Sequence, residues 1–442
     1  MTTARKRRGA FWLGVGLVTA LLACGLPAGL AMVYVDRLPF RSETAGTATA
    51  GPAPSPRPGD PFTVTQAWLR DRIAELVDEQ AAALLRGDEQ GFVALALPGS
   101  PAVATLRRQF RSLRAMGVSV WRPRVDALPE RVERGGGVEW RVAIDVEHCF
   151  GAPDCAVSQV SITSWWVDES AGPRVRAVEP SGTSREGPNR EGPRPWEVSD
   201  LVAVVGERTV VATTRDNRSL LPRLSLEAER AAAVADRYVV GGRQPDRYRV
   251  YYAAGPEWRR WYGGNRPQWT AGYAVAIGGG NYDVVLNGDR VQPARAGDLL
   301  RHELTHVASL PAEGFPNGTA WWLVEGMAEL AGAGGRPVSR YGSLPEVRRL
   351  LTAGKWDGQL ATVEPPADAE GWEVTGRYGV GYLAVRHLAD RFGERRLLEF
   401  FAAVVHERRP PDRAAWDVFG EEWAVLHEEC VRYVRAAAGV ST

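Results

Sequence analysis

The stretch "RHELTHVASL", residues 301 to 310, places two histidines four positions apart in a chain of 442 residues that contains only six. A helix turns by about 100° per residue, so His302 and His306 project from one face, one turn apart. Both imidazoles can then reach one metal ion at about 2.0–2.1 Å. Glu303 points to one side and can approach a metal-bound water without displacing a ligand. The stretch therefore predicts a helix that carries part of a zinc site.

A second helical stretch supplies the third ligand. "TAWWLVEGMAEL", 319 to 330, is amphipathic and places Glu325 after His306 with eighteen residues between them. The loop "PAEGFPNG" allows a helix–loop–helix hairpin to return that carboxylate to the metal. Two histidines, one glutamate and one water make the open tetrahedral zinc site of a hydrolase. Glu329 lies one turn further on, where it can accept a hydrogen bond from a ligand imidazole.

The two segments together resemble the gluzincin metallopeptidases, whose best-known members are the thermolysin and aminopeptidase-N families. The wording "HELTHV…WWLVEGMAEL" is closest to the bacterial peptidase MA-like group. The resemblance is strong over 296–393 and weaker over 200–440. It implies a zincin-type mixed sheet with helices and a peptide or protein substrate. It also implies that His302, His306 and Glu325 bind zinc and that Glu303 is the catalytic base.

The same resemblance covers a later helix, "GRYGVGYLAVRHLADRFGERRLLEFF", 376 to 401. In the aminopeptidase-N type, a tyrosine that opens this helix stabilises the oxyanion. Tyr378 fits that role better than Tyr382, because it precedes the same small-residue spacing; the alternative is that both are core aromatics. A phenol in this place donates a hydrogen bond to the developing negative charge.

One departure from the family pattern puts exopeptidase specificity in doubt. Aminopeptidases of this type carry a Gly-x-Met-Glu-Asn strand that captures the substrate's free amine. The corresponding region here, "AIGGGNYDVVLNGD", contains no glutamate. The run Gly278–Gly280 either lets a substrate backbone approach an edge strand or forms a hairpin turn.

The N-terminus predicts a membrane anchor. "RKRR", 5 to 8, precedes an uncharged segment from Ala10 to Val35 that is long enough to cross the ~30 Å hydrocarbon core as a helix. The basic cluster predicts a cytoplasmic N-terminus, with the rest of the chain outside the cell membrane. A cleaved signal peptide and a lipoprotein signal ending at Cys24 are the alternatives. In an oxidising compartment, Cys149 and Cys155 are expected to form a disulfide.

Patterning along the chain predicts an α+β fold. Helical spacing in 62–115 is followed by alternating, strand-like segments, a pattern that loosely resembles the NTF2-like domains. The formal net charge of +1 argues against a nucleic-acid partner. The expected divisions are a basic tail and anchor (1–36), a Pro/Gly-rich linker (37–61), an NTF2-like domain (62–180), a second linker (181–197) and a metallopeptidase domain (198–442).

These observations predict a membrane-anchored, extracytoplasmic zinc metallopeptidase. The rival interpretation is a catalytically inactive surface module that keeps zinc for binding or structure. The intact Glu303 argues against that rival. The histidines outside the motif are expected to have packing or solvated roles; they are His148, His387, His406 and His427.

Overall fold

The computed structural model describes residues 55–440, except 135, 183–191, 243, 265, 268, 313, 315–317 and 367. The expected membrane segment, Cys24 and most of the first linker lie outside the described residues. Within the described part, no helix combines the length and the apolar character that crossing a membrane requires. Helices and two five-stranded sheets build this part of the chain, and the predicted α+β class is confirmed.

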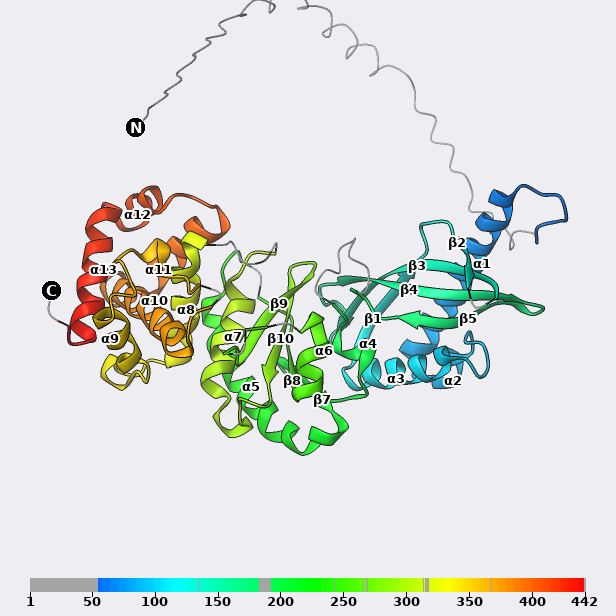
Figure 1. Ribbon diagram of the computed structural model, residues 1–442, viewed down its shortest axis with the longest axis horizontal. Helices are drawn as coiled ribbons and strands as arrows, with labels where there is room; N and C mark the ends of the chain where they lie inside the picture. The colour runs from blue at the N-terminus through cyan, green and yellow to red at the C-terminus, as the bar shows by residue number, and fades with distance from the viewer. Residues whose placement is uncertain are drawn as a thin grey trace, which may run out of the picture. The chain divides into compact units, whose positions relative to one another are not determined.

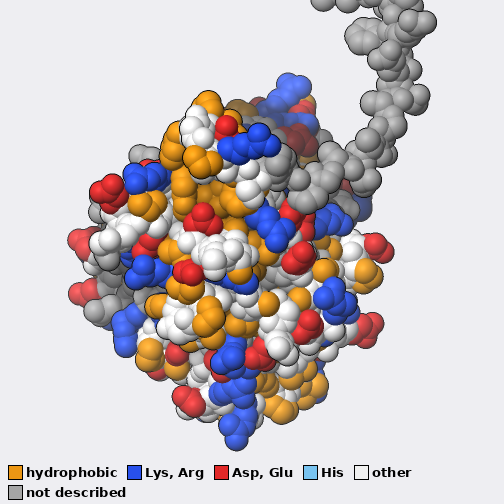
Figure 2. Space-filling model, turned by 90° about the vertical axis from the view of Figure 1, so that its right-hand side faces the viewer, with side chains coloured by type: hydrophobic (Ala, Val, Ile, Leu, Met, Phe, Trp, Pro, Cys, Tyr) orange, Lys and Arg blue, Asp and Glu red, His pale blue; other side chains and the backbone are white. Residues whose placement is uncertain are grey.

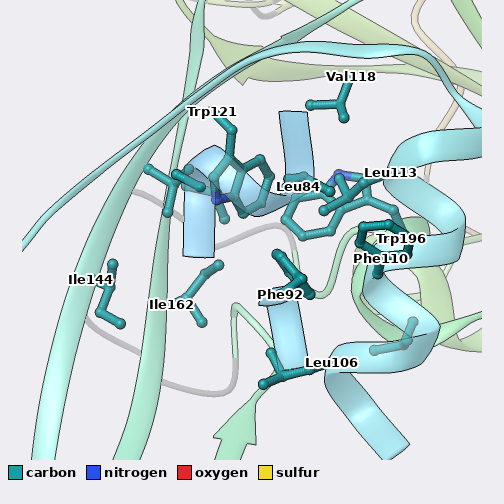
Figure 3. Packing of buried hydrophobic residues seen from close by; sticks show 14 of the residues in the cluster. Leu84, Phe92, Leu106, Phe110, Leu113, Val118, Trp121, Ile144, Ile162 and Trp196 are labelled. Atoms are coloured by element: carbon teal, nitrogen blue, oxygen red, sulfur yellow. The ribbon is translucent and has the colours of Figure 1, made fainter. Parts of the chain in front are cut away.

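The first sheet is antiparallel, with the order β1-β3-β4-β5 and with β2 paired to β3. Along β3, Trp140, Val142, Ile144 and Val146 alternate with more exposed residues, so the sheet has one buried face. Helices pack on that face, and Figure 3 shows Phe92 among side chains from both layers. The elements are α1 (Phe62–Arg86), α2 (Glu89–Val93), α3 (Pro101–Ala115), β1 (Val118–Arg124), β2 (Glu130–Arg134), β3 (Gly137–Phe150), β4 (Ser158–Glu169) and β5 (Gly172–Glu179).

The second sheet is mixed, with the order β6-β7-β8-β10-β9. Strand β8 is parallel to both of its neighbours, whereas the two outer pairs are antiparallel. Among the described strands, β9 has β10 as its one partner and therefore forms an edge. The elements are α4 (Pro195–Val198), β6 (Leu201–Val205), β7 (Thr209–Thr214), α5 (Leu221–Ala235), β8 (Tyr248–Ala253), α6 (Gly255–Arg260), β9 (Gly272–Gly278) and β10 (Asn281–Asn287).

Both faces of the second sheet are buried, and each belongs to a different core. Val250 and Tyr252 of β8 face α5 and the helix that follows β10. Tyr251 and Ala253 point to the opposite face and belong to the hydrophobic cluster between the first sheet and its helices. One continuous core therefore runs from the first sheet into the second, across the segment 181–197 that the sequence marks as a break.

The glycine run 278–280 forms the turn of the β9–β10 hairpin, which decides between the two interpretations of that run. All three residues have positive φ angles of 87°, 65° and 74°. A Cβ on Gly279 would lie 2.0 Å from the carbonyl oxygen of Val157, so only glycine fits where the hairpin tip meets the first sheet. The side chain of Asn281 also joins the hairpin to this segment, because it donates to the carbonyl of the neighbouring Ala156 over 3.1 Å.

The remaining helices form a third layer around their own core, to which Leu323, Leu383 and Phe400 belong. In Figure 1 this layer occupies the C-terminal end of the chain, coloured yellow to red. Figure 2 shows the opposite end of the described part, which carries the first sheet, and basic and acidic side chains are interspersed on that face. Helix α7 (Gly297–Ser309) packs in the core of the second sheet. The helices of the third layer are α8 (Trp321–Ala333), α9 (Leu344–Thr352), α10 (Gly371–Phe392), α11 (Glu394–Phe401), α12 (Pro411–Phe419) and α13 (Trp423–Ala437), with a π-helical segment at Ala402–His406.

Candidate metal centre

The hairpin of α7 and α8 lies between the second sheet and the C-terminal helices. Leu300 and Leu304 of α7 pack in the core shared with the sheet. His302 and His306 lie on the other face of α7 and are 8% and 7% exposed. Helix α8 packs tightly on α10, because a Cβ on Gly326 would lie 2.4 Å from the carbonyl oxygen of Gly381. This close packing sets the position of the carboxylates that α8 carries.

Three side chains meet where the two helices face each other. The Nε2 atoms of His302 and His306 lie 3.1 Å apart. Oε2 of Glu325 lies 3.2 Å from the first and 3.3 Å from the second. Ligands bound tetrahedrally to zinc at about 2.0–2.1 Å lie roughly 3.3–3.4 Å from one another. The three residues can therefore hold a metal ion.

The unmet bonding capacity of these atoms also fits a metal. Within the described residues, the buried Oε2 of Glu325 has no hydrogen-bond partner. Glu303, Glu325 and Glu329 lie together, and in the described part of the chain none of them forms an ion pair with lysine or arginine. A proton on one of these side chains or a bound cation can then offset the charge of the three carboxylates, of which those of Glu303 and Glu325 are buried.

The pKa values of the metal-free site follow from this arrangement. Burial acts to lower the pKa of His302, but Glu325 and Glu329 outweigh it and raise that pKa well above its ordinary value. Burial acts to raise the pKa of Glu325, but His306 and His302 outweigh it and lower that pKa to about 2. For Glu303, burial is the largest effect and raises the pKa. In the absence of a metal, the cluster thus retains a proton on His302.

A cavity of about 440 Å³ lies beside this cluster, and its wall includes His302, one of the three ligands. Glu303 is 4% exposed and lies in its wall, next to the first residue of the edge strand. A Cβ on Gly272 would approach Oε1 of Glu303 to 2.9 Å. The carboxylate of Glu303 is therefore adjacent to the ligands and borders space that a substrate can enter.

Tyr378 lies in the wall of the same cavity. Its ring centroid is 6.0 Å from that of His302, and the ring of Trp321 packs against it edge-on at 4.9 Å. Burial and the nearby Glu325 raise the pKa of Tyr378 well above its ordinary value, so the phenol keeps its proton and can donate it in a hydrogen bond. Tyr382 is fully buried and packs in the core of the C-terminal helices.

Glu329 lies where the helical spacing predicts, behind His302. Its Oε1 is 3.2 Å from Nδ1 of that imidazole, the nitrogen that faces away from the other ligands. The second carboxylate oxygen accepts a hydrogen bond of 2.8 Å from the hydroxyl of Tyr341. The sequence analysis missed Tyr341, because it lies in a turn before α9 and belongs to no motif.

The other histidines and the cysteines lie apart from this cluster. His406 donates to the carbonyl of Ser309 over 2.7 Å, and His427 accepts from the amide of Leu360 over 3.2 Å. His148 is buried among aromatic rings, and His387 stacks on Tyr433. A disulfide joins Cys149 to Cys155, and Cys430 is a buried free thiol.

Comparison with known proteins adds little to this geometry. No protein-family model matches the chain, and no curated protein matches it. Among solved structures, the chain shows a likeness to the "native yeast LTA4 hydrolase", with a TM-score of 0.34 and 13% sequence identity. The likeness covers 67% of this chain and 50% of that chain, so this chain matches half the length of the other. A TM-score of this size is too low to support an inference about fold or function.

Proposed function

We propose that the chain is a zinc-dependent metallopeptidase of the gluzincin type, with His302, His306 and Glu325 as the zinc ligands. The observation that carries the proposal is the meeting of two imidazoles and one carboxylate next to a cavity whose wall includes His302 and Glu303. Two histidines, one glutamate and an open fourth position are the ligand set of catalytic zinc rather than of a closed structural site.

The roles of the surrounding residues follow from their chemistry. When bound, zinc supplies Lewis acidity, which polarises a carbonyl group and makes water a better nucleophile near neutral pH. The carboxylate of Glu303 accepts the proton of the attacking water and passes it to the leaving amine. The hydroxyl of Tyr378 donates a hydrogen bond to the oxygen of the carbonyl under attack. Glu329 accepts a hydrogen bond from Nδ1 of His302 and so holds the ring in the tautomer that leaves Nε2 free for the metal.

Location and organisation are part of the same proposal. The uncharged segment 10–35 supports a single membrane anchor with the N-terminus in the cytoplasm. The disulfide between Cys149 and Cys155 is compatible with a folded part outside the membrane, because such bonds persist in oxidising compartments. We further propose that residues 62–180 form an NTF2-like domain and residues 198–442 the peptidase domain.

The test uses the full chain purified in detergent. Metal analysis is expected to find about one zinc per chain in the wild type and in Glu303→Gln, and none in His302→Ala. A mixture of quenched fluorescent peptides is expected to be cleaved by the wild type alone, with chelator abolishing the signal. A wild type without zinc would refute the metal site, whereas zinc without cleavage of any peptide would favour the inactive surface module.

A further inference from the structure

A chain of hydrogen-bonding groups extends from the ligand imidazole to Tyr341. His302 turns Nε2 toward the other two ligands and Nδ1 toward Glu329. Glu329 uses its two oxygens on opposite sides, since Oε1 faces His302 at 3.2 Å and Oε2 accepts from Tyr341 at 2.8 Å. The phenol of Tyr341 is therefore connected to the metal ligand through one carboxylate.

Tyr341 is itself held in place from two directions. Its backbone amide donates to the carbonyl of Val338 over 2.9 Å, which closes the turn ahead of α9. Its ring packs on the ring of Tyr382, with centroids 4.2 Å apart and planes inclined by 31°. Tyr382 is fully buried on α10, one turn beyond Tyr378. Helix α10 thus carries Tyr378, which lines the cavity, and Tyr382, which packs against Tyr341.

The carboxylate of Glu329 needs a fixed donor to stay in this position. Its side chain is 26% exposed, so solvent can compete for its oxygens. Burial and Glu329 itself raise the pKa of Tyr341 well above its ordinary value, so this hydroxyl remains a donor at neutral pH. A donor fixed by packing favours the one rotamer in which Oε1 faces Nδ1 of His302.

We propose that Tyr341 is a positioning residue of the zinc site: its hydroxyl orients Glu329, and Glu329 orients the imidazole of His302 toward the metal. The inference rests on the proposed function only in taking the ion at the three ligands to be zinc. Partners of this kind typically change metal affinity by about 10- to 100-fold when they are removed. Because Tyr341 acts through Glu329, we expect an effect near the lower end, about tenfold.

The experiment measures the dissociation constant of zinc by competition with a chromophoric chelator, on the full chain in detergent. Tyr341→Phe removes the hydroxyl and keeps the ring, and the constant is expected to rise about tenfold. Tyr382→Phe is the matched control, because no hydrogen bond of the described residues joins that hydroxyl to Glu329, and the constant is expected to stay within twofold of the wild type. The melting temperature of the metal-free protein is measured for each variant.

A double-mutant cycle separates positioning from general packing. If Tyr341 acts through Glu329, then Tyr341→Phe combined with Glu329→Gln binds zinc no more weakly than Glu329→Gln alone. Additive losses would overturn the proposal. So would a Tyr341→Phe protein with a lower metal-free melting temperature and unchanged zinc affinity. A wild type that binds no zinc would instead refute the proposed function, so the two failures are distinguishable.

Discussion

Two of the buried charged clusters in the described part of the chain differ in how their charge is balanced. In the second sheet, Asp283 accepts from Nε of Arg249 over 2.5 Å and from the hydroxyl of Tyr262. These residues are between 2% and 7% exposed, and one cation offsets one anion. At α7 and α8, three carboxylates face two imidazoles beside a cavity. The first cluster satisfies itself, whereas the second requires a proton or a metal, and this difference distinguishes a structural pair from a ligand site.

The largest expected effect concerns catalysis at the second cluster, the candidate metal site. Glu303→Gln keeps the size and polarity of the side chain but cannot accept a proton. We expect kcat/KM to fall about 10³-fold, the middle of the range for loss of a general base, with zinc content unchanged. Steady-state cleavage of a fluorescent peptide, with metal analysis of the same sample, checks this. Activity equal to that of the wild type would show that Glu303 is not the base.

A substitution in the first cluster, that of Asp283 and Arg249, is expected to change only the stability of the protein. Asp283→Asn leaves the guanidinium of Arg249 buried without a counter-charge, which costs about 3–5 kcal/mol of unfolding free energy. Urea unfolding with and without chelator measures this loss, and we expect it in both conditions. The matched change, Glu325→Gln, is expected to abolish zinc binding and to cost less in the metal-free protein, because water in the cavity can solvate the remaining groups. Equal losses in metal-free protein would remove the distinction between the clusters.

Tyr378→Phe sharpens the comparison inside the cavity. Loss of one donor to the developing oxyanion typically lowers the rate by about 10²–10³-fold. We expect kcat to fall about 10²-fold, with zinc affinity and melting temperature unchanged. A fall confined to KM would indicate that Tyr378 contacts the bound substrate without stabilising the transition state.

The smallest effect is the pH dependence of zinc affinity. In the metal-free protein the pKa of His302 is raised, so this imidazole is protonated at neutral pH and must release its proton when it binds zinc. Zinc affinity should therefore rise with pH up to that raised pKa and fall by about tenfold per unit on the acid side. Calorimetry in buffers of different ionisation enthalpy measures the released proton, and release near zero at pH 7 would contradict the expected charge state.

Helical spacing carries most of what could be predicted about the site. A separation of four places His302 and His306 on one face whatever the rest of the fold, and the hairpin length brings Glu325 within reach. The position of β9 beside Glu303 could not be predicted, because strand pairing depends on contacts far apart in the sequence. The role of Tyr341 could not be predicted for the same reason, since its contact with Tyr382 depends on how the turn before α9 packs against α10.

The alternatives for the glycine run 278–280 also needed the structure. Three glycines permit both a turn and the approach of a substrate backbone, and the structure shows the turn of the β9–β10 hairpin. The carbonyl of Val157 beside Gly279 explains why glycine is needed there. For 62–180 the α+β class followed from periodicity, because the helical segments precede the alternating segments there. For 198–442 the mixed sheet with helices came from the family resemblance. The expected anchor lies outside the described residues and stays a prediction.

The hydrophobic cluster that runs from the first sheet onto the inner face of the second has a consequence for how the chain can be divided. A fragment that begins near residue 198 would present Tyr251, Val285 and their neighbours to water and would be prone to aggregation. The two halves should therefore melt in a single cooperative transition. Removal of either part, the first sheet with its helices or the region that begins with the second sheet, would expose an apolar surface on the other.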